Sequence, residues 1–482
     1  MSFVFCHREQ ELNAAVCVIG GGPAGATVAR KLAQLGHSTV VIEKSVFPRS
    51  HVGESLTPGI LPLLDALNLR QRIEQAGFLR PDQTIIHWPP LYGRKKLGTE
   101  PGFQVDRAQL DTLLLQAAEE AGASLLQGAK LQEFGRCEHG GWNCLVQWNG
   151  KRSTISSRFL VDASGRRGAV RGAKRPQGIG TLAIWGYWEQ SRLAGTETRV
   201  EAGTEEWFWG APLPDGTFNA TVFVDTATYR TFFQILGSAE AVYRHLLRRS
   251  ELLNPCLAGR LVGGAKTCDA TPYSANDPVF PGGLRIGEAS FSVDPLSSQG
   301  VQAAVGSGLH AAAVLHTSLI RPEQREVAHT FYRQRQREAV EFYRVAAASL
   351  YAQVAVERES HFWQRRSAEN IRSSQRSERN RPGSLNSETL IHLSPETRIT
   401  STACLAGDFV VMRESITHPG VTGPLVFLEN VSVAPLVECL HKPLTVDQTV
   451  KEWSRTIPGE RARRILTWLW EHGAIVELSV AQ

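Results

Sequence analysis

The chain lacks three features that would place it in a membrane, outside the cell or on a nucleic acid. No run of about twenty apolar residues occurs, so no membrane-spanning helix is predicted. The first residues carry charge and no apolar stretch, so no signal peptide is predicted. The net charge of +5 is mild and does not require a nucleic-acid partner. We therefore expect a cytoplasmic globular protein with no membrane or nucleic-acid partner.

The cysteines also lack a functional pattern. None of the eight shows paired metal-ligand spacing, and Cys17 lies inside an apolar run, where a small buried thiol is expected. This usage suits a reducing compartment better than a disulfide framework, and it predicts no metal site. At 482 residues the chain can bury a large core and is long enough for about three structural units.

A glycine-rich segment, residues 20–25, follows the apolar run 16–19 and precedes a helical pattern. Gly20 permits a tight turn, Gly22 lets the backbone approach a pyrophosphate, and Gly25 allows close packing of helix on strand. The amides at the helix N-terminus then favour a negatively charged phosphate. The segment therefore predicts a dinucleotide site.

An acidic residue and a late pair of loops complete this pattern. Glu43 ends the next apolar strand, at the spacing where a carboxylate accepts ribose hydroxyls. Residues 283–290 and 294–301 supply a second set of loops. Together the segments predict bound FAD, whose isoalloxazine does redox chemistry that no side chain provides. No second glycine fingerprint for NAD(P)H is present.

The order of patterns predicts an α/β chain with added domains. Strand, glycine turn, helix and strand open a Rossmann-like sheet. Residues 181–225 are rich in strand-forming aromatics, with a hairpin turn at 213–216. Residues 324–366 have helical periodicity, and a polar, arginine-rich stretch follows them. We predict an FAD-binding domain (first part, 1–180), an antiparallel β-sheet substrate domain (181–270), the second part of the FAD-binding domain with helices (271–363), a linker (364–396) and a C-terminal winged-helix-like domain (397–482).

Several motifs within this frame resemble the flavin-dependent halogenase and monooxygenase superfamily. Besides the glycine segment and Glu43, they are Phe-Pro-Arg-Ser-His-Val-Gly-Glu-Ser at 47–55, Gln-Val-Asp-Arg at 104–107, Asp-Ala-Ser-Gly at 162–165 and the 287–301 loops. The resemblance covers about residues 14–360. It implies the fold of para-hydroxybenzoate hydroxylase, with the flavin between an α/β domain and a β-sheet substrate domain.

The resemblance also assigns residues to FAD. Within residues 47–55, here called the strap, Gly53 and Glu54 match the segment that crosses the flavin in halogenases. Glu288 stands where the family usually has aspartate, which keeps the charge on a longer arm. The cofactor-binding positions implied are Gly20, Gly22, Pro23, Ala24, Gly25, Glu43, Lys44, Arg49, Gly53, Arg107, Gly287, Glu288, Pro295, Gly300 and Val301.

A tryptophan element marks the halogenase branch of the family. Trp207 and Trp209 keep its two tryptophans and Pro212 its proline, but Ala211 replaces the usual isoleucine. The two tryptophans either contact the substrate and keep it from the flavin peroxide, or pack in the core as buried tryptophans often do.

Two departures from the halogenase pattern favour hydroxylation. Halogenases use a lysine to bind or aim hypohalous acid, and Pro81 stands at that position with neither charge nor donor. The acid used by tryptophan halogenases is missing from residues 296–299. The resemblance then implies oxygen transfer from C4a-hydroperoxyflavin to an electron-rich ring. Candidate catalytic residues on the strap and the facing strand are Glu54, His87 and Arg80.

The C-terminal unit bears on the substrate. Its order of elements resembles the PqqD-like domains, which bind leader peptides by strand addition; a dimerisation or packing domain is the alternative. The combination is most similar to the flavoprotein monooxygenases of quinohemoprotein amine dehydrogenase biogenesis. That resemblance implies hydroxylation of a peptidyl tryptophan on the route to tryptophylquinone.

The implied partners are a precursor subunit with its leader and a radical-SAM cross-linking enzyme. FAD would be reduced by NAD(P)H directly or through a flavin reductase, with O2 as co-substrate. A halogenase or small-aromatic hydroxylase of natural-product biosynthesis is the alternative enzyme. A flavoprotein that serves only as a binding scaffold is a third hypothesis.

Overall fold

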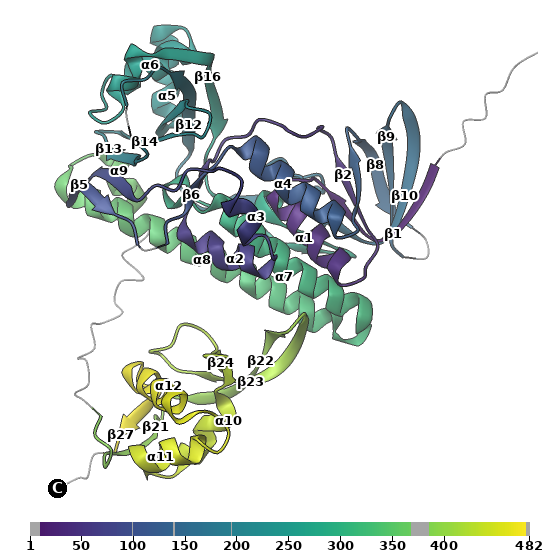
Figure 1. Cartoon of the computed structure of the whole chain (residues 1–482), viewed down its shortest axis with the longest axis vertical. Coiled ribbons are helices and arrows are strands. Elements are labelled where there is room, and N and C mark those ends of the chain that lie inside the picture. The colour runs from purple at the N-terminus through teal and green to yellow at the C-terminus, as the bar shows by residue number, and fades with distance from the viewer. Residues whose placement is uncertain (1–9, 99, 138–139, 194, 368–384, 479–482) are drawn as a thin grey trace, which may run out of the picture. The chain divides into compact units, whose positions relative to one another are not determined.

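The computed structural model describes residues 10–98, 100–137, 140–193, 195–367 and 385–478. The chain divides into two compact units. The larger comprises residues 1–319 and 332–375, and the smaller comprises 320–331 and 376–482. Figure 1 shows the larger unit as an α/β layer beside a second sheet.

The α/β layer is built on a sheet of eight strands with the order β18-β19-β10-β1-β2-β7, to which β9 and β8 add at β10. Its central pairs, β1 with β2 and with β10, are parallel. The strands are β1 (Gln10–Ile19), β2 (Thr39–Glu43), β7 (Ser124–Gln127), β8 (Lys130–Arg136), β9 (Trp142–Trp148), β10 (Lys151–Asp162), β18 (Val279–Phe280) and β19 (Gly283–Arg285). Helix α1 (Pro23–Gln34) packs on α4 (Arg107–Glu120) beside β2. The predicted Rossmann-like start is confirmed.

The second sheet has seven strands in the order β16-β12-β15-β14-β13-β4-β5. All neighbours pair antiparallel except β13 with β4, which are parallel. The strands are β4 (Gln83–Trp88), β5 (Leu91–Lys96), β12 (Thr181–Glu189), β13 (Thr198–Ala202), β14 (Glu206–Pro212), β15 (Phe218–Asp225) and β16 (Arg260–Asp269). The predicted hairpin turn at 213–216 joins β14 to β15. The sheet is therefore mixed rather than purely antiparallel, and it takes two strands from within residues 1–180.

Helices cover both faces of the second sheet. Helices α5 (Thr226–Leu236) and α6 (Ala239–Leu247) pack on one face, in a cluster that includes Phe208 and Tyr243. The C-terminal part of α8 (Arg325–Glu357) and α9 (His361–Ser367) pack on the other, in a cluster around Trp88, Trp207 and Trp363. The predicted helical stretch 324–366 is confirmed with one break, after which Ser360 Oγ accepts a hydrogen bond from the Phe362 N–H.

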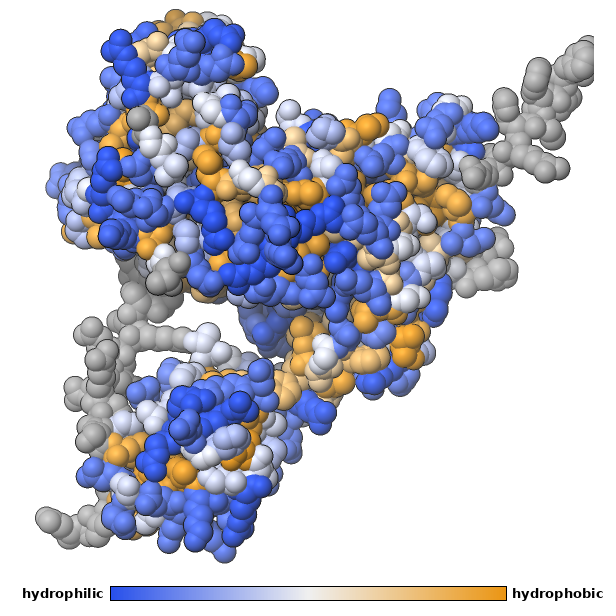
Figure 2. Space-filling model, viewed as in Figure 1, coloured by the Kyte–Doolittle hydropathy of each residue, from blue (hydrophilic) through white to orange (hydrophobic). Residues whose placement is uncertain are grey.

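Helix α7 (Gly300–Ile320) is the one described helix that is long and apolar enough to cross a bilayer. About two thirds of its apolar window (67%) is buried inside the protein, as in a core helix. The face of the molecule in Figure 2 is largely hydrophilic, with apolar residues in small groups.

The smaller unit has its own core. Strand β21 (Leu390–Leu393) lies between β26 (Leu444–Thr445) and β27 (Ile475–Glu477), and a long hairpin, β22 (Arg398–Ala406) and β23 (Phe409–Thr417), stands apart from them. Helices α10 (Ala434–Val437), α11 (Val446–Trp453) and α12 (Gly459–Glu471) pack with β21 and β27. The long hairpin precedes the helices, and the winged-helix assignment stays a prediction.

The predicted linker 364–396 is shorter than expected. Helix α9 continues through Ser367, and β21 begins at Leu390, so both ends of the segment are ordered elements. Its middle, 368–384, lies outside the described residues.

Candidate functional site

The glycine turn at the end of β1 is packed too tightly for any side chain. Gly20 has φ +106°, and a Cβ there would collide with the carbonyl oxygen of Ala163. A Cβ on Gly25 would collide with the carbonyl oxygen of Gly20. Gly22 is the N-cap of α1 and offers no side chain to cap it. The first amides of α1 are therefore free of a side-chain cap, as a phosphate site requires.

Glu43 is held against this turn. One carboxylate oxygen, Oε2, accepts the Gly21 N–H at 2.8 Å, and Oε1 accepts the Ser45 N–H at 2.8 Å. The residue is buried, whereas its neighbour Lys44 is exposed. The turn and the acid therefore come together as the spacing predicts.

Two arginines lie beside the same turn. Arg107 is buried, makes two hydrogen bonds to Asp111 and donates from Nη1 to the Val52 carbonyl at 2.8 Å. The Arg49 guanidinium lies 3.4 Å from Asp111, and its Nε is buried with no hydrogen-bond partner. A Cβ on Gly22 would lie 3.3 Å from Arg49 Nη2, so the guanidinium of Arg49 lies at the turn. Arg107 holds the strap, and Arg49 is the cation with a donor left for a phosphate.

The strap is pinned to the second sheet through Glu54, which is 2% exposed. Its Oε1 accepts the Tyr187 hydroxyl at 2.7 Å. Its Oε2 accepts the Gly53 N–H at 2.8 Å and Asn219 Nδ2 at 3.1 Å. Burial raises the pKa of Glu54, and the hydrogen bonds from Tyr187 and Gly53 oppose that rise. We call Glu54, Tyr187 and Asn219 the clamp.

Gln104 completes the polar end of this region. Its Nε2 donates to Thr198 Oγ1 at 2.7 Å, while its Oε1 is buried without a partner. The motif at 104–107 was recognised from the sequence, but this acceptor was not. Tyr187 and Asn219 were also missed, because they reach Glu54 only through the pairing of distant strands.

The side of the second sheet that carries Tyr187 is here called the inner face. Strand register places one row of side chains across it, here called the middle row: Lys266, Trp185, Thr221, Trp209, Val200 and Ile86. Trp209 is half-buried in this row. The row therefore offers two indole rings flanked by apolar and polar neighbours, which suits an aromatic ligand.

Trp207 lies in a different environment. It is 1% exposed and stacks on Phe223 with ring centroids 3.8 Å apart. Trp88 meets it edge to face at 6.3 Å, and α8 and α9 cover the cluster. Of the two predicted substrate residues, Trp207 is therefore core packing and Trp209 alone lies in the middle row.

The structure does not bring the three predicted catalytic residues together. His87 follows Ile86, so its side chain points away from the inner face, and its Nδ1 lies 3.3 Å from a carboxylate oxygen of Glu251. Arg80 is exposed and pairs with Glu74 at 3.1 Å. Of the three predicted catalytic residues, Glu54 is therefore the one that is buried at the inner face, because alternation along β4 turns His87 away and Arg80 lies on the surface.

The late loops return to the start of α1. Gly287 has φ +53°, its N–H donates to Ser307 Oγ at 2.8 Å, and a Cβ there would lie 2.9 Å from the Cβ of Ala24. Glu288 is exposed. Pro295 opens a short 3-10 helix (Pro295–Ser297), and Gly300 and Val301 begin α7. The early and late segments predicted to share a cofactor are therefore neighbours.

The residues present fit FAD. The uncapped amides of α1 and the spare donor of Arg49 suit a pyrophosphate. Glu43 suits a ribose, and the orphaned Gln104 Oε1 needs a donor such as a hydroxyl. No three His, Cys, Asp or Glu side chains gather as metal ligands within the described ranges.

Comparisons with known proteins agree with this site. A family model described as an FAD binding domain matches residues 13–191. Tryptophan 2-halogenase of Chondromyces crocatus is 29% identical over 367 residues, which are 72% of this chain and 69% of that protein. The flavin-dependent halogenase otaD of Aspergillus carbonarius (strain ITEM 5010) is 30% identical over 348 residues, 64% of this chain and 68% of that protein.

Two solved structures share the fold over nearly their whole length. CmlS, a flavin-dependent halogenase, superposes with a TM-score of 0.79 at 21% identity, covering 98% of this chain and 97% of that chain. Peptidyl tryptophan dihydroxylase QhpG superposes with a TM-score of 0.69 at 23% identity, covering 96% and 99%. Both alignments extend through the smaller unit.

Proposed function

Because this chain belongs to the superfamily of flavin-dependent halogenases and monooxygenases, we propose that it uses reduced FAD and O2 to oxidise an aromatic substrate at the middle row. The clamp carries this proposal. The strap begins beside the pyrophosphate turn and is fixed to the inner face by the buried Glu54. A flavin under the strap would therefore face the two indoles of the middle row.

Each part of the site has a task in such a reaction. Bound FAD, once reduced, supplies the electrons that activate O2. The α1 amides, Arg49 and Glu43 bind its nucleotide half. The clamp keeps the strap in place and keeps water from its underside, and Trp185 and Trp209 hold the aromatic ring for attack.

Halogenation of a small aromatic compound is the first candidate. The curated relatives described above are named as halogenases. Pro81 is buried and offers no cation, but Lys266 stands in the middle row with its Nζ 5.8 Å from the centroid of the Tyr187 ring. From the sequence we expected Pro81 to leave the lysine position of halogenases without a cation, and Lys266 is an exposed lysine on the edge strand β16. We assign to Lys266 the task of holding hypohalous acid near the ring.

Hydroxylation of a peptidyl tryptophan is the second candidate. It is favoured by the missing lysine at Pro81 and by the extent of the likeness to the dihydroxylase. The smaller unit does not distinguish the candidates, because the alignment with the halogenase CmlS also covers nearly the whole chain. A leader peptide bound at that unit belongs to this second candidate only.

One assay separates the candidates. The FAD-loaded enzyme is supplied with NADH, a flavin reductase, O2 and either indole, a phenol or a tryptophan-containing peptide, with and without bromide. Halogenation predicts a product with bromine in place of hydrogen, formed only with bromide and lost in K266M. The control K96M changes an exposed lysine on β5 whose side chain points away from the inner face.

Other outcomes would contradict the ranking of halogenation ahead of hydroxylation. Addition of oxygen to the peptide regardless of bromide would favour hydroxylation. Unaltered bromination by K266M would remove Lys266 from the reaction. Reduced enzyme that fails to consume O2 would favour the binding-scaffold hypothesis.

A further inference from the structure

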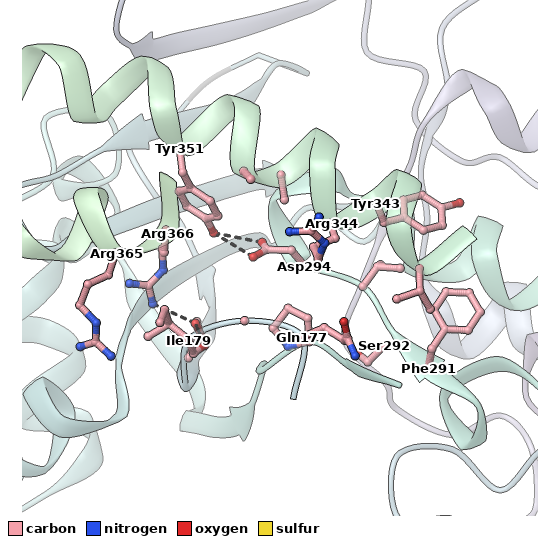
Figure 3. A pocket seen from close by; sticks show the side chains of 17 residues that line it. Gln177, Ile179, Phe291, Ser292, Asp294, Tyr343, Arg344, Tyr351, Arg365 and Arg366 are labelled. Carbon is pink, nitrogen blue, oxygen red and sulfur yellow. Dashed lines mark hydrogen bonds between the residues drawn. The ribbon is translucent and has the colours of Figure 1, made fainter. Parts of the chain in front are cut away.

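The loop that follows β20 (Phe291–Ser292) is tied to α8 by a buried pair of side chains. Asp294 begins this loop, which here means residues 294–301, and caps the short helix at 295–297 through the Leu296 N–H at 3.0 Å. The Tyr351 hydroxyl, from α8, lies 3.1 Å from both carboxylate oxygens of Asp294. Figure 3 shows the Tyr351 hydroxyl pointing at Asp294.

The pair is connected onward to the second sheet. The Arg366 guanidinium, from α9, lies 5.8 Å from the centroid of the Tyr351 ring. It donates to Asp225 at 2.5 Å and to Thr181 Oγ1 at 3.0 Å, at the two paired strand ends of β15 and β12. Tyr351 also packs in the aromatic cluster with Trp207. One residue thus links the loop to the sheet that carries the middle row.

A small cavity lies beside the pair, and Leu296 of the loop packs against the aromatic cluster. The cavity, of about 40 Å³, lies against Asp294 and Tyr351, lined in part by Ser292, Tyr343 and Arg366. Within the loop, Asp294 also accepts Ser297 Oγ at 2.8 Å through its backbone carbonyl, and Ser298 has φ +50°. The loop therefore holds a tight internal shape, and Tyr351 fixes that shape relative to the rest of the larger unit.

We propose that Tyr351 is a positioning residue for the oxygen reaction. By holding Asp294, it keeps in place the loop that leads into α7, the helix whose Ser307 accepts the Gly287 N–H. The oxidising power of O2 then reaches the substrate and is not released as hydrogen peroxide. The inference rests on the proposed function, because it concerns how reduced FAD reacts.

The electrons of reduced FAD end in different products in peroxide release, hydroxylation and halogenation. In the wasteful reaction, reduced FAD gives two electrons and two protons to O2, which leaves as H2O2. In hydroxylation the same two electrons reduce one oxygen atom to water while the other enters the C–H bond of the substrate. In halogenation both oxygen atoms leave as water and a halide, oxidised, replaces the hydrogen. A loop displaced from the flavin admits water and favours the first fate.

The test compares Y351F with Y343F. Both tyrosines are on α8 and line the same cavity, but Figure 3 shows the Tyr343 hydroxyl pointing away from Asp294. The Tyr343 hydroxyl makes no hydrogen bond to any described residue. Each variant is loaded with FAD, reduced without oxygen and mixed with aerated buffer, and the rate of H2O2 release is measured.

We expect Y351F to release peroxide on the order of tenfold faster than the unmodified enzyme, a change that corresponds to about 1.4 kcal/mol in the barrier. FAD affinity and the thermal midpoint of Y343F and the unmodified enzyme should match. D294N, which keeps an acceptor for Tyr351, should show a smaller rise. The double variant D294N/Y351F should add little to Y351F, because the two residues act as one pair.

An unchanged rate in Y351F, or an equal rise in Y343F, would overturn the assignment. If Y351F unfolds, D294N carries the test, and a rate equal to that of the unmodified enzyme overturns the assignment as well. Failure of the proposed function looks different: the unmodified reduced enzyme would then not consume O2 at all.

Discussion

Replacing Tyr187 with phenylalanine tests the clamp most directly. The change removes one hydroxyl and keeps the ring, so no cavity is created beyond an oxygen atom. The lost hydrogen bond is 2.7 Å long and ends on a carboxylate that is 2% exposed. A hydrogen bond to a charged group contributes about 1.5–3 kcal/mol. We therefore expect Y187F to lose that amount in free energy of unfolding of the larger unit.

The same change should weaken FAD binding. With one of its two links to the second sheet gone, the strap keeps Asn219, Arg107 and the backbone hydrogen bond from the Val105 N–H to the Glu54 carbonyl. We expect the Kd for FAD to rise on the order of tenfold, which corresponds to about 1.4 kcal/mol. Urea unfolding followed by tryptophan fluorescence gives the first quantity, and quenching of free FAD fluorescence gives the second.

A matched control distinguishes the hydrogen bond from the general effect of removing a hydroxyl. The Tyr229 hydroxyl, on α5, makes no hydrogen bond to a described residue, so Y229F should leave both quantities within experimental error. If Y187F changes the unfolding free energy by less than about 0.5 kcal/mol and leaves the Kd for FAD unchanged, the clamp does not hold the strap.

Three further outcomes are expected. G25A should bind no FAD in an absorbance titration because its Cβ meets a backbone carbonyl, whereas G306A, where nothing lies within 4 Å, should bind it normally. Burial raises the folded-state pKa of Glu54 above its ordinary value. The contribution of Glu54 to stability is therefore complete below its unfolded pKa and is lost as pH rises through its folded pKa. The urea midpoint of E54Q should not show this fall with rising pH. W207A should cost about 3–5 kcal/mol of stability, whereas W209A should lower turnover more than it lowers the melting temperature.

Local sequence patterns were enough to predict the nucleotide end of the site. The glycine segment, Glu43 and the late loops each follow a buried strand, and parallel strands bring their ends to one edge. The contact of Gly287 with Ala24 could therefore be expected in outline. Helix α1 could be predicted equally well because its apolar spacing is regular.

Contacts between strands far apart in the chain could not be predicted from the sequence. Tyr187 and Asn219 meet Glu54 across 133 and 165 residues, and no local pattern encodes that register. The alternation of Trp207 and Trp209 shows that they share a face, but not that α8 and α9 cover one of them. Residues 226–236 form α5 although their threonines and aromatics favour strands, because Tyr229, Phe232 and Leu236 pack, partly buried, against the cluster on the sheet.

The meeting of Gly287 with Ala24 also bears on how the protein is made. During synthesis, the glycine turn at residues 20–25 is made long before Gly287, so the nucleotide site is among the last parts of the larger unit to assemble. FAD that contacts both segments would hold the early and late parts of the sequence together. Cells short of riboflavin should then accumulate a more protease-sensitive form of this chain, and added FAD should raise its melting temperature with the logarithm of concentration.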